Sequence, residues 1–186
     1  TEASTEIARE AERAGGIVQR IRHFARKRQA TRETVNLAEI AEEARRLIVG
    51  MLARAPEVII ENRLTAHCKV LADGAQIQQV FLNLIKNAID ANRDLPIERQ
   101  NLRIVIEPLE NRAAVHVIDQ GVGLDTEQLT HLFEPFFTTK PDGLGLGLPI
   151  CKTIIEAHGG RLWAEPNQET PGMRFSFSLP CHELSA

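Results

Sequence analysis

The sequence predicts an α+β fold: a two-layer α/β sandwich, in which one mixed sheet carries helices on one face, preceded by a long N-terminal helix. The predicted strands come in pairs separated by helices, an order typical of a sheet with helices packed on one side. Residues 2–30 carry apolar residues at helical spacing throughout. With 186 residues, the chain has room for one compact domain plus an appendage, or for two small domains.

The segment of residues 2–30 is predicted to be a helix that packs against a partner helix. Its apolar or small residues recur in steps of four and three, and Ile17 and Phe24 widen the stripe towards that of a helical bundle. This seam consists of Ile7, Ala11, Ala14, Val18, Ile21 and Ala25. A helix that packs on its own domain is the alternative interpretation.

The later elements are predicted from helix caps and from periodicity. Asn36, with Glu39 three residues further on, indicates a capped helix start, so a domain boundary is expected near residues 29–35. Alternation of apolar and polar residues predicts the strands. Further helices are predicted to begin at Asp73, Asp125 and about Gly147, and strands are predicted over residues 57–64, 68–72, 101–109, 113–119, 161–165 and 173–180.

Composition excludes several classes of protein. The net charge is −3, so the chain lacks the basic footprint of a nucleic-acid-binding protein. No apolar run approaches the ~20 residues that cross a bilayer, and the N-terminus lacks the order of a signal peptide. Cys68, Cys151 and Cys181 are odd in number, far apart and without metal-ligand spacing, which favours a reducing compartment over a disulfide scaffold. A cytoplasmic protein without membrane contact is expected.

The helix that begins at Asp73 combines an apolar stripe with a polar one. The apolar stripe consists of Ile77, Val80, Phe81, Leu84, Ile85, Ala88 and Ile89. Asn83, Lys86, Asn87 and Asp90 repeat the same spacing on the neighbouring face. Neutral amides offer oxygen ligands, and Mg²⁺ takes only one or two protein oxygens where phosphates and water supply the others. Asn87 is therefore a candidate magnesium ligand, and ordinary solvated side chains are the alternative.

Two glycine-rich stretches point to a nucleotide. Asp119 ends a predicted strand just before Gly121 and Gly123, where a carboxylate can bind a flat heterocycle while the backbone passes close by. The stretch "GLGLGL" over residues 143–148 leads into a helix, so backbone N–H groups and a helix N-terminus converge as anion binding requires. The stretch fits neither a P-loop nor a dinucleotide fingerprint.

The four stretches "NLIKN", "DQGVG", "FEPFFTTK" and "GLGLGL" occur in this order. They resemble the N, G1, F and G2 boxes of sensor histidine kinases, in the ATP-binding catalytic domain of two-component systems. The resemblance covers roughly residues 35–180, and the closing "TPGMRFSFSLP" is similar to the last strands of that family. It implies the Bergerat-type ATP-binding fold of the GHKL superfamily, with ATP and Mg²⁺ as cofactors.

The resemblance also assigns roles to individual residues. It implies that Asn87 ligates Mg²⁺, that Asn83 and Lys86 lie near the phosphates, and that Asp119 accepts the adenine amino group. Asn83, Lys86 and Lys140 form the expected catalytic set. Other residues expected to bind the nucleotide are Asp90, Gly121, Gly123, Phe133, Phe137, Thr138, Thr139, Gly143, Leu144, Gly145, Leu146 and Gly147.

The stretch from about Leu124 to Gly143 is predicted to be a mobile lid over the nucleotide. Phe133, Phe136 and Phe137 lie in a polar stretch bounded by glycines, so they can dock when a ligand fills the site and release when it leaves. Plain core residues are the alternative interpretation of the three phenylalanines.

The residue at position 83 favours a kinase over an ATPase. In gyrase-type topoisomerases, mismatch-repair ATPases and heat-shock chaperones of similar fold, a glutamate one helical turn before the magnesium asparagine acts as general base for water. An amide such as that of Asn83 takes no proton near neutral pH, so transfer must rely on an external nucleophile. The alternatives are a protein-serine kinase that regulates a sigma factor and a nucleotide-binding module without transfer activity.

The resemblance further predicts the partners. Residues 1–33 are expected to form the second helix of a dimerisation hairpin whose first helix is missing, and residues 34–186 the catalytic domain. The expected partners are ATP or ADP, a response-regulator receiver domain and a second copy of the chain. No histidine before His182 is followed by an acidic residue, as the phosphoacceptor of the family would be. His182 opens "HELSA", which is interpreted as a coincidental tail.

Overall fold

The structure is a computed structural model that describes residues 31–52, 56–65, 68–140 and 143–182. The helix predicted over residues 2–30 lies outside the described residues, and so do the last four residues of "HELSA". The division of the chain at residue 33 therefore stays a prediction. In the part of the chain that the structure describes, no helix is long and apolar enough to cross a membrane.

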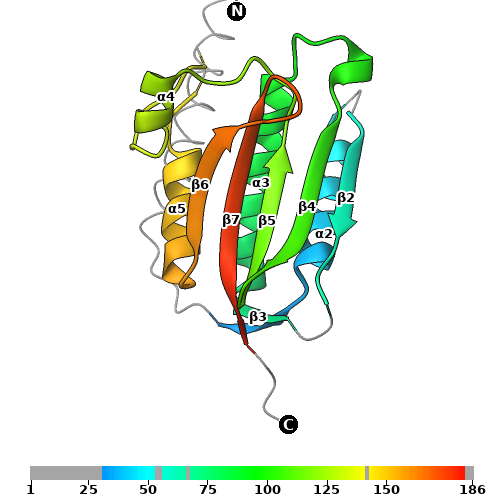
Figure 1. Cartoon of the computed structure of the whole chain (residues 1–186), viewed down its shortest axis with the longest axis vertical. Coiled ribbons are helices and arrows are strands. Elements are labelled where there is room, and N and C mark those ends of the chain that lie inside the picture. The colour runs from blue at the N-terminus through cyan, green and yellow to red at the C-terminus, as the bar shows by residue number, and fades with distance from the viewer. Residues whose placement is uncertain (1–30, 53–55, 66–67, 141–142, 183–186) are drawn as a thin grey trace, which may run out of the picture.

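One seven-stranded mixed sheet forms the first layer of the domain (Figure 1). Its order is β1-β3-β7-β5-β4-β2. β6 lies off this path and pairs with residues 173–178 of β7, whereas β3 pairs with residues 181 and 182. Only β2 and β4 are parallel; the other pairs are antiparallel. The strands are β1 (Glu33–Val35), β2 (Val58–Asn62), β3 (Lys69–Ala72), β4 (Leu102–Leu109), β5 (Arg112–Ile118), β6 (Arg161–Pro166) and β7 (Met173–His182).

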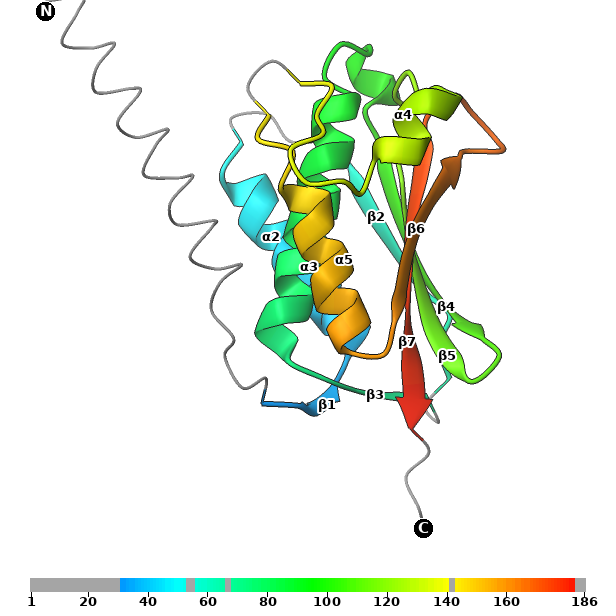
Figure 2. The same ribbon diagram turned by 90° about the vertical axis from the view of Figure 1, so that its left-hand side faces the viewer.

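The second layer consists of helices on one face of this sheet. Figure 2 shows α2, α3 and α5 side by side against the sheet, while α4 lies at one end of the molecule. The helices are α2 (Leu37–Gly50), α3 (Gly74–Ala91), α4 (Thr126–His131) and α5 (Gly147–Ala157), with a short 3₁₀ turn, η1 (Ile97–Arg99). The predicted fold class, one mixed sheet with helices on one face, is confirmed.

The core lies between the two layers and forms because strand and helix stripes meet. Along β7, Phe175 and Phe177 are buried against the helices, and alternate residues face the other side. Phe81 on α3 meets Phe177 edge to face, with ring centroids 5.5 Å apart. The apolar stripe predicted on α3 is confirmed, since all of its members except half-buried Ile89 are buried.

Local capping sets where the helices begin, as predicted. The Asn36 side chain accepts hydrogen bonds from the N–H groups of Ala38 (3.0 Å) and Glu39 (3.4 Å) at the start of α2. Asp73 caps α3, and Asp125 forms a full capping box with Gln128 on α4. The strand β1, which pairs with β3, was not predicted, because a three-residue edge strand has too little alternation to be recognised.

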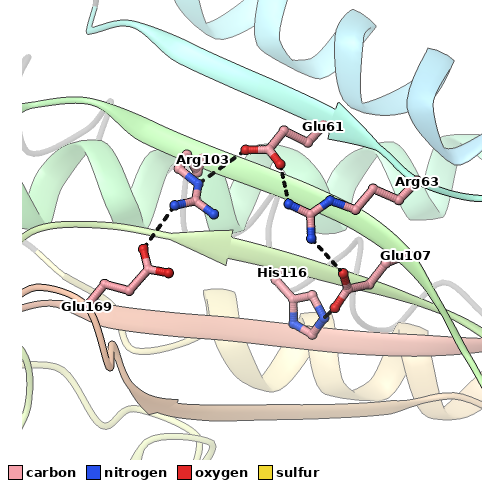
Figure 3. A network of polar contacts seen from close by, with 6 residues as sticks. All are labelled: Glu61, Arg63, Arg103, Glu107, His116 and Glu169. Carbon is pink, nitrogen blue, oxygen red and sulfur yellow. Dashed lines mark hydrogen bonds and ion pairs between the residues drawn. The ribbon is translucent and has the colours of Figure 1, made fainter.

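The face of the sheet away from the helices carries a network of ion pairs (Figure 3). In two of its pairs, Arg63–Glu107 and Arg103–Glu169, the nitrogen and oxygen atoms are 3.0 Å apart. Each side chain of the network is a third or more exposed, except that of His116. Each exposed pair therefore contributes only about 0–1 kcal/mol to stability. Burial lowers the pKa of His116, which keeps its imidazole neutral near pH 7. The network consists of Glu61, Arg63, Arg103, Glu107, His116 and Glu169.

The expectation about the cysteines was wrong on one point. Cys68 and Cys181 form a disulfide, with Cα atoms 5.0 Å apart, whereas Cys151 is a buried free thiol. The two paired cysteines are 113 residues apart in sequence, and they meet because β3 lies beside the end of β7. Spacing along the chain cannot reveal such a pair, since it arises from strand order.

His158 connects α5 to the start of α3 and is only 5% exposed. Its Nε2 accepts the backbone N–H of Asp73 at 3.0 Å, and its Nδ1 lies 2.8 Å from the carbonyl oxygen of Ile154. These partners require the neutral tautomer with the proton on Nδ1, because the Ile154 carbonyl can only accept. The ring therefore satisfies one N–H at the N-terminus of α3 and one carbonyl near the C-terminus of α5.

Replacing His158 with leucine is expected to lower the free energy of unfolding by about 1–3 kcal/mol, because the Asp73 N–H loses its buried acceptor. Urea denaturation monitored by circular dichroism measures this change. The same substitution at His131, whose side chain is 45% exposed, serves as the control and should change stability by less than about 0.5 kcal/mol. Equal effects at the two positions would contradict the role given to His158.

Candidate functional site

The polar residues singled out in the sequence lie at one end of the domain. The C-terminus of α3, the end of β5 and the N-terminus of α5 meet there, together with α4 and the segment that connects α4 to α5 (Figures 1 and 2). On α3, Lys86 is exposed, whereas Asn83, Asn87 and Asp90 are half-buried. The polar stripe of α3 therefore faces the space beside this segment, next to the buried stripe.

Asp119 is the most buried charged residue of this end, at 1% exposure. Its Oδ1 accepts the backbone N–H groups of Gly121 (2.9 Å) and Met173 (3.1 Å). Its Oδ2 is buried and has no hydrogen-bond partner among the residues that the structure describes. A buried carboxylate oxygen without a partner is costly, so a ligand with an N–H donor would satisfy Oδ2.

Burial raises the pKa of Asp119, and the two backbone hydrogen bonds and the positive charge of Lys140 oppose this increase. The Asp119 carboxylate and the Lys140 ammonium, which binds Asn87 and Asp90, both lie at this end of the domain. A heterocycle with an amino group and an anionic tail would complement both of them.

Three residues that sequence reasoning missed hold the Asp119 turn in place. Asn92, 1% exposed at the C-terminus of α3, accepts the N–H of Gln120 at 3.0 Å and donates to two carbonyl groups near η1. Asn167 donates to the carbonyl oxygen of Asp119 at 3.3 Å. Gly172 leaves space for that carbonyl group, which a Cβ would overlap. Only strand order brings these residues to the turn, so no local signal could have identified them.

Gly121 has a structural role in the turn that follows Asp119. A Cβ at this position would lie 2.8 Å from the carbonyl oxygen of Ala91, closer than real Cβ atoms approach. Gly121 is therefore required by the close contact of the turn with the end of α3. Gly123 adopts φ +76°, a conformation that favours glycine.

The lid phenylalanines differ in their surroundings. Phe133 packs partly against the core, with the Lys152 ammonium 5.8 Å from its ring centroid, and Phe137 is half-buried. Phe136 is 73% exposed and has φ +70°, and its N–H donates to the Gly145 carbonyl oxygen at 3.0 Å. Gly145 itself has φ +63°, and a Cβ there would overlap the backbone of Phe136 and Phe137. Two of the three rings therefore pack on the domain.

Lys140 connects this segment to α3. Its Nζ donates to Asn87 Oδ1 at 3.1 Å and to Asp90 Oδ2 at 2.8 Å. Thr138 Oγ1 accepts the N–H of Lys140 at 3.1 Å, and Thr139 is exposed. The two acceptor oxygens on successive turns of α3 thus stabilise a positive charge.

The N-terminus of α5 adjoins the same stripe. Among the described residues no side chain caps its N–H groups, and Gly143, Leu144, Gly145 and Leu146 precede it. Gly147, its first residue, lies beside Asn83, because a Cβ there would be 3.7 Å from Asn83 Oδ1. This uncapped helix N-terminus, at the same end of the domain as Lys86 and Lys140, would stabilise an anion.

A buried thiol lies beneath this end of α5. Burial raises the pKa of Cys151 to about 12, although an interaction with the Asn83 side chain opposes this increase. The thiol is therefore protonated and unreactive near pH 7. Cys151 belongs to the packing of α5 rather than to the chemistry of the site.

These groups fit a nucleoside triphosphate with a bound cation. Asp119 Oδ2 offers an acceptor for an adenine amino group, and Lys86, Lys140 and the α5 N-terminus offer positive charge for phosphates. Asn87 and Asp90 offer oxygens to a cation, since they already bind the Lys140 ammonium. Within the described ranges, no cluster of three His, Cys, Asp or Glu residues could hold a metal alone.

Known proteins match both the sequence and the structure. Residues 72–183 match the family described as histidine kinase-, DNA gyrase B- and HSP90-like ATPases. The chain is 40% identical over 177 residues to the sensor protein FixL of Bradyrhizobium diazoefficiens, covering 93% of this chain and 34% of that protein. It is 34% identical over 176 residues to the sensor histidine kinase ZraS of Klebsiella oxytoca, covering 94% and 37%. The chain thus spans about a third of the length of these relatives.

Solved structures give the same result. The catalytic domain of histidine kinase ThkA superposes with a TM-score of 0.69 at 33% identity, covering 81% of this chain and 95% of that domain. Histidine kinase ThkA in complex with the response regulator protein TrrA gives a TM-score of 0.74 at 29% identity, covering 95% and 49%. The chain therefore belongs to the family of histidine kinase-, DNA gyrase B- and HSP90-like ATPases, and within it to the catalytic domains of sensor histidine kinases.

Proposed function

We propose that this chain transfers the γ-phosphoryl group of Mg-ATP to a histidine on a dimerisation helix, for relay to an aspartate of a response regulator. The observation that carries the ATP assignment is the buried Oδ2 of Asp119, which lacks a hydrogen-bond partner within the described residues. Adenine presents an amino group that can donate to it. Membership in the kinase family supports the transfer step.

Each polar residue of the site receives one role in this proposal. Asp119 binds the adenine amino group, and Asn87 ligates Mg²⁺, which would neutralise phosphate charge in the transition state. Asn83, Lys86 and Lys140 contact the phosphates. The other residues proposed to bind the nucleotide are Asp90, Gly121, Gly123, Phe133, Phe137, Thr138, Thr139, Gly143, Leu144, Gly145, Leu146 and Gly147.

Lys140 would change partners when the nucleotide binds. Its ammonium is held by Asn87 Oδ1 and Asp90 Oδ2, two oxygens that a bound cation would also attract. Lys140 would leave them when Asn87 ligates the cation, and its charge would then neutralise a phosphate. The segment that carries Lys140 would move with it, which supports the predicted lid.

The amide of Asn83 supports transfer to a protein rather than to water. It cannot act as a general base near neutral pH, and Cys151 beside it is protonated. The residues one turn away from Asn83 on α3 are Gln79, Val80, Lys86 and Asn87, and none of these four is a carboxylate. The geometry thus favours a nucleophile supplied by another helix.

The partners are proposed from the family. The structure of ThkA with TrrA is described as a kinase in complex with a response regulator protein, which supports a receiver domain as the partner of this chain. Residues 1–33 are proposed to supply half of a dimerisation hairpin in a cytoplasmic homodimer. The match of solved kinases to 94–95% of this chain supports this extension beyond the catalytic domain.

The experiment that tests the proposal mixes this protein with γ-labelled ATP, Mg²⁺ and a separately made helical hairpin that carries a phosphoacceptor histidine. Protein-bound label and free phosphate are followed together. Acid-labile label on the hairpin is expected, and label should be lost with the Asn87→Ala variant as negative control. Free phosphate without label would mean that the chain is a hydrolase of the same fold, and nucleotide binding without either product would mean a non-catalytic module.

A further inference from the structure

We propose that Cys68 and Cys181 form a redox-responsive pair that fastens the β1–β3 ribbon to the end of β7. The two residues are bonded in the structure, and neither takes part in the nucleotide site. The inference therefore stands independently of the proposed kinase function. It adds a modification site where β3 meets the end of β7, and Figure 1 shows this place at the opposite end of the sheet from the end of β5, which Asp119 follows.

The bond lies where the hydrogen-bonded ladder of β7 is shortest. β7 pairs with β5 over seven residue pairs and with β6 over six, but with β3 over only two. Cys181 is paired with Val70 in this short ladder, and Cys68 directly precedes β3. β1 in turn pairs with β3, through Glu33 to Val35. The covalent bond therefore reinforces the weakest connection of the ribbon to the sheet.

Accessibility distinguishes this pair from the third cysteine. Cys68 and Cys181 are both half-buried, so a small thiol or disulfide can reach their sulfur atoms. Cys151 is fully buried, and burial raises its pKa to about 12, so it is protected from the same reagents. Oxidation and reduction should therefore be confined to one pair.

The chemistry is thiol–disulfide exchange with a glutathione-type disulfide. One protein thiolate attacks the oxidant and releases the first glutathione as a thiol, forming a mixed disulfide. The second protein thiolate then attacks the protein sulfur of that mixed disulfide and releases the second glutathione. In sum, two protein thiols are oxidised to one disulfide, and one glutathione disulfide is reduced to two thiols.

Through β3, the disulfide also affects β1, the first strand that the structure describes. β1 continues into the Asn36 cap of α2, and Arg32 just before it donates to the Ala157 carbonyl oxygen at 2.5 Å, at the end of α5. In the oxidised state the bond holds β3, and through it β1, at the edge of the sheet. In the reduced state no covalent bond holds them, and they depend on short ladders, the Arg32 hydrogen bond and buried side chains such as Val70 and Ala72.

The test equilibrates the protein with glutathione mixtures from fully reducing to fully oxidising and counts accessible thiols by alkylation and mass measurement. The expected result is two accessible thiols at the reducing end, none at the oxidising end and a single transition between them. No transition, with two thiols throughout, would overturn the pair. No transition, with a disulfide at every ratio, would mean a permanent structural bond and would overturn the redox response.

Hydrogen exchange tests the structural consequence on the same samples. Reduction should speed exchange of the β1 and β3 amides by about tenfold, while amides of β5 and α3 stay within about twofold. Cys68→Ser and Cys181→Ser should each reproduce the reduced pattern under oxidising conditions. Unchanged exchange in β1 and β3 after complete reduction would overturn the fastening role. ATP affinity, measured alongside, should stay within about twofold, which separates this test from that of the proposed function.

Discussion

Asp119→Asn is expected to lower the affinity for adenine nucleotides by about 10- to 100-fold and to bring guanine nucleotides to equal or better binding. The direction follows from the two backbone N–H groups, of Gly121 and Met173, that point at one side-chain oxygen. An asparagine must keep its carbonyl oxygen there, so its NH₂ group takes the place of Oδ2. This donor would face the amino group of adenine but would match the O6 acceptor of guanine.

The pH dependence gives a second readout for the same residue. Burial raises the pKa of Asp119, so its carboxyl takes up a proton at a higher pH than an ordinary aspartate. ATP affinity should therefore fall as the pH drops through this raised pKa. Folding stability changes in the opposite direction. As the pH drops, protonation of Asp119 makes its contribution to stability more favourable, because the folded state binds this proton more tightly than the unfolded chain. A loss of affinity without a loss of fold identifies the carboxyl group.

Isothermal titration with ATP and GTP between pH 5 and 8 measures both effects. The variant Asp94→Asn, which carries the same change at an exposed position of the same end of the domain, is the control and should bind as the parent protein does. Parallel losses for ATP and GTP in Asp119→Asn would show that the substitution damages the turn rather than base recognition. An unchanged pH profile in that variant would also contradict the assignment.

Features encoded by local spacing were predictable from the sequence. The helix starts at Asn36, Asp73 and Asp125 could be predicted, because a capping side chain reaches backbone N–H groups only two or three residues away. The two stripes of α3 follow from its 3.6-residue period alone. For the same reason, Asn83, Asn87 and Asp90 could be placed on one face before any tertiary contact was known.

Features created by strand order were not predictable. Asn92 and Asn167 reach the Asp119 turn from 28 and 48 residues away, and nothing in their own surroundings in the sequence marks them. The partner of Cys68 depends on the pairing of β3 with β7. The roles assigned to Lys86 and Lys140 from the family resemblance stay predictions, although the contact of Lys140 with Asn87 brings the two stretches together as expected.

Asn87→Ala is expected to remove the dependence of ATP binding on Mg²⁺, with a loss of about 10- to 100-fold in affinity at saturating Mg²⁺ and little change in its absence. Asn87 supplies a neutral oxygen on the polar stripe of α3, and this oxygen already binds the Lys140 ammonium at 3.1 Å. Alanine deletes the oxygen but leaves the 2.8 Å pair of Lys140 with Asp90, so the local fold should persist. An intact thermal transition would check this point.

Lys86→Ala separates metal ligation from plain charge. Lys86 is exposed one residue before Asn87, and its ammonium can attract phosphates but cannot ligate a cation. Its removal should weaken ATP binding by the same factor with and without Mg²⁺, because the lost interaction does not involve the metal. Titrations of ATP at several Mg²⁺ concentrations distinguish the two variants by the slope of ATP affinity against Mg²⁺ concentration, rather than by affinity alone. If Asn87→Ala kept the slope of the parent protein, another oxygen, of which Asp90 is the nearest candidate, would have to hold the metal.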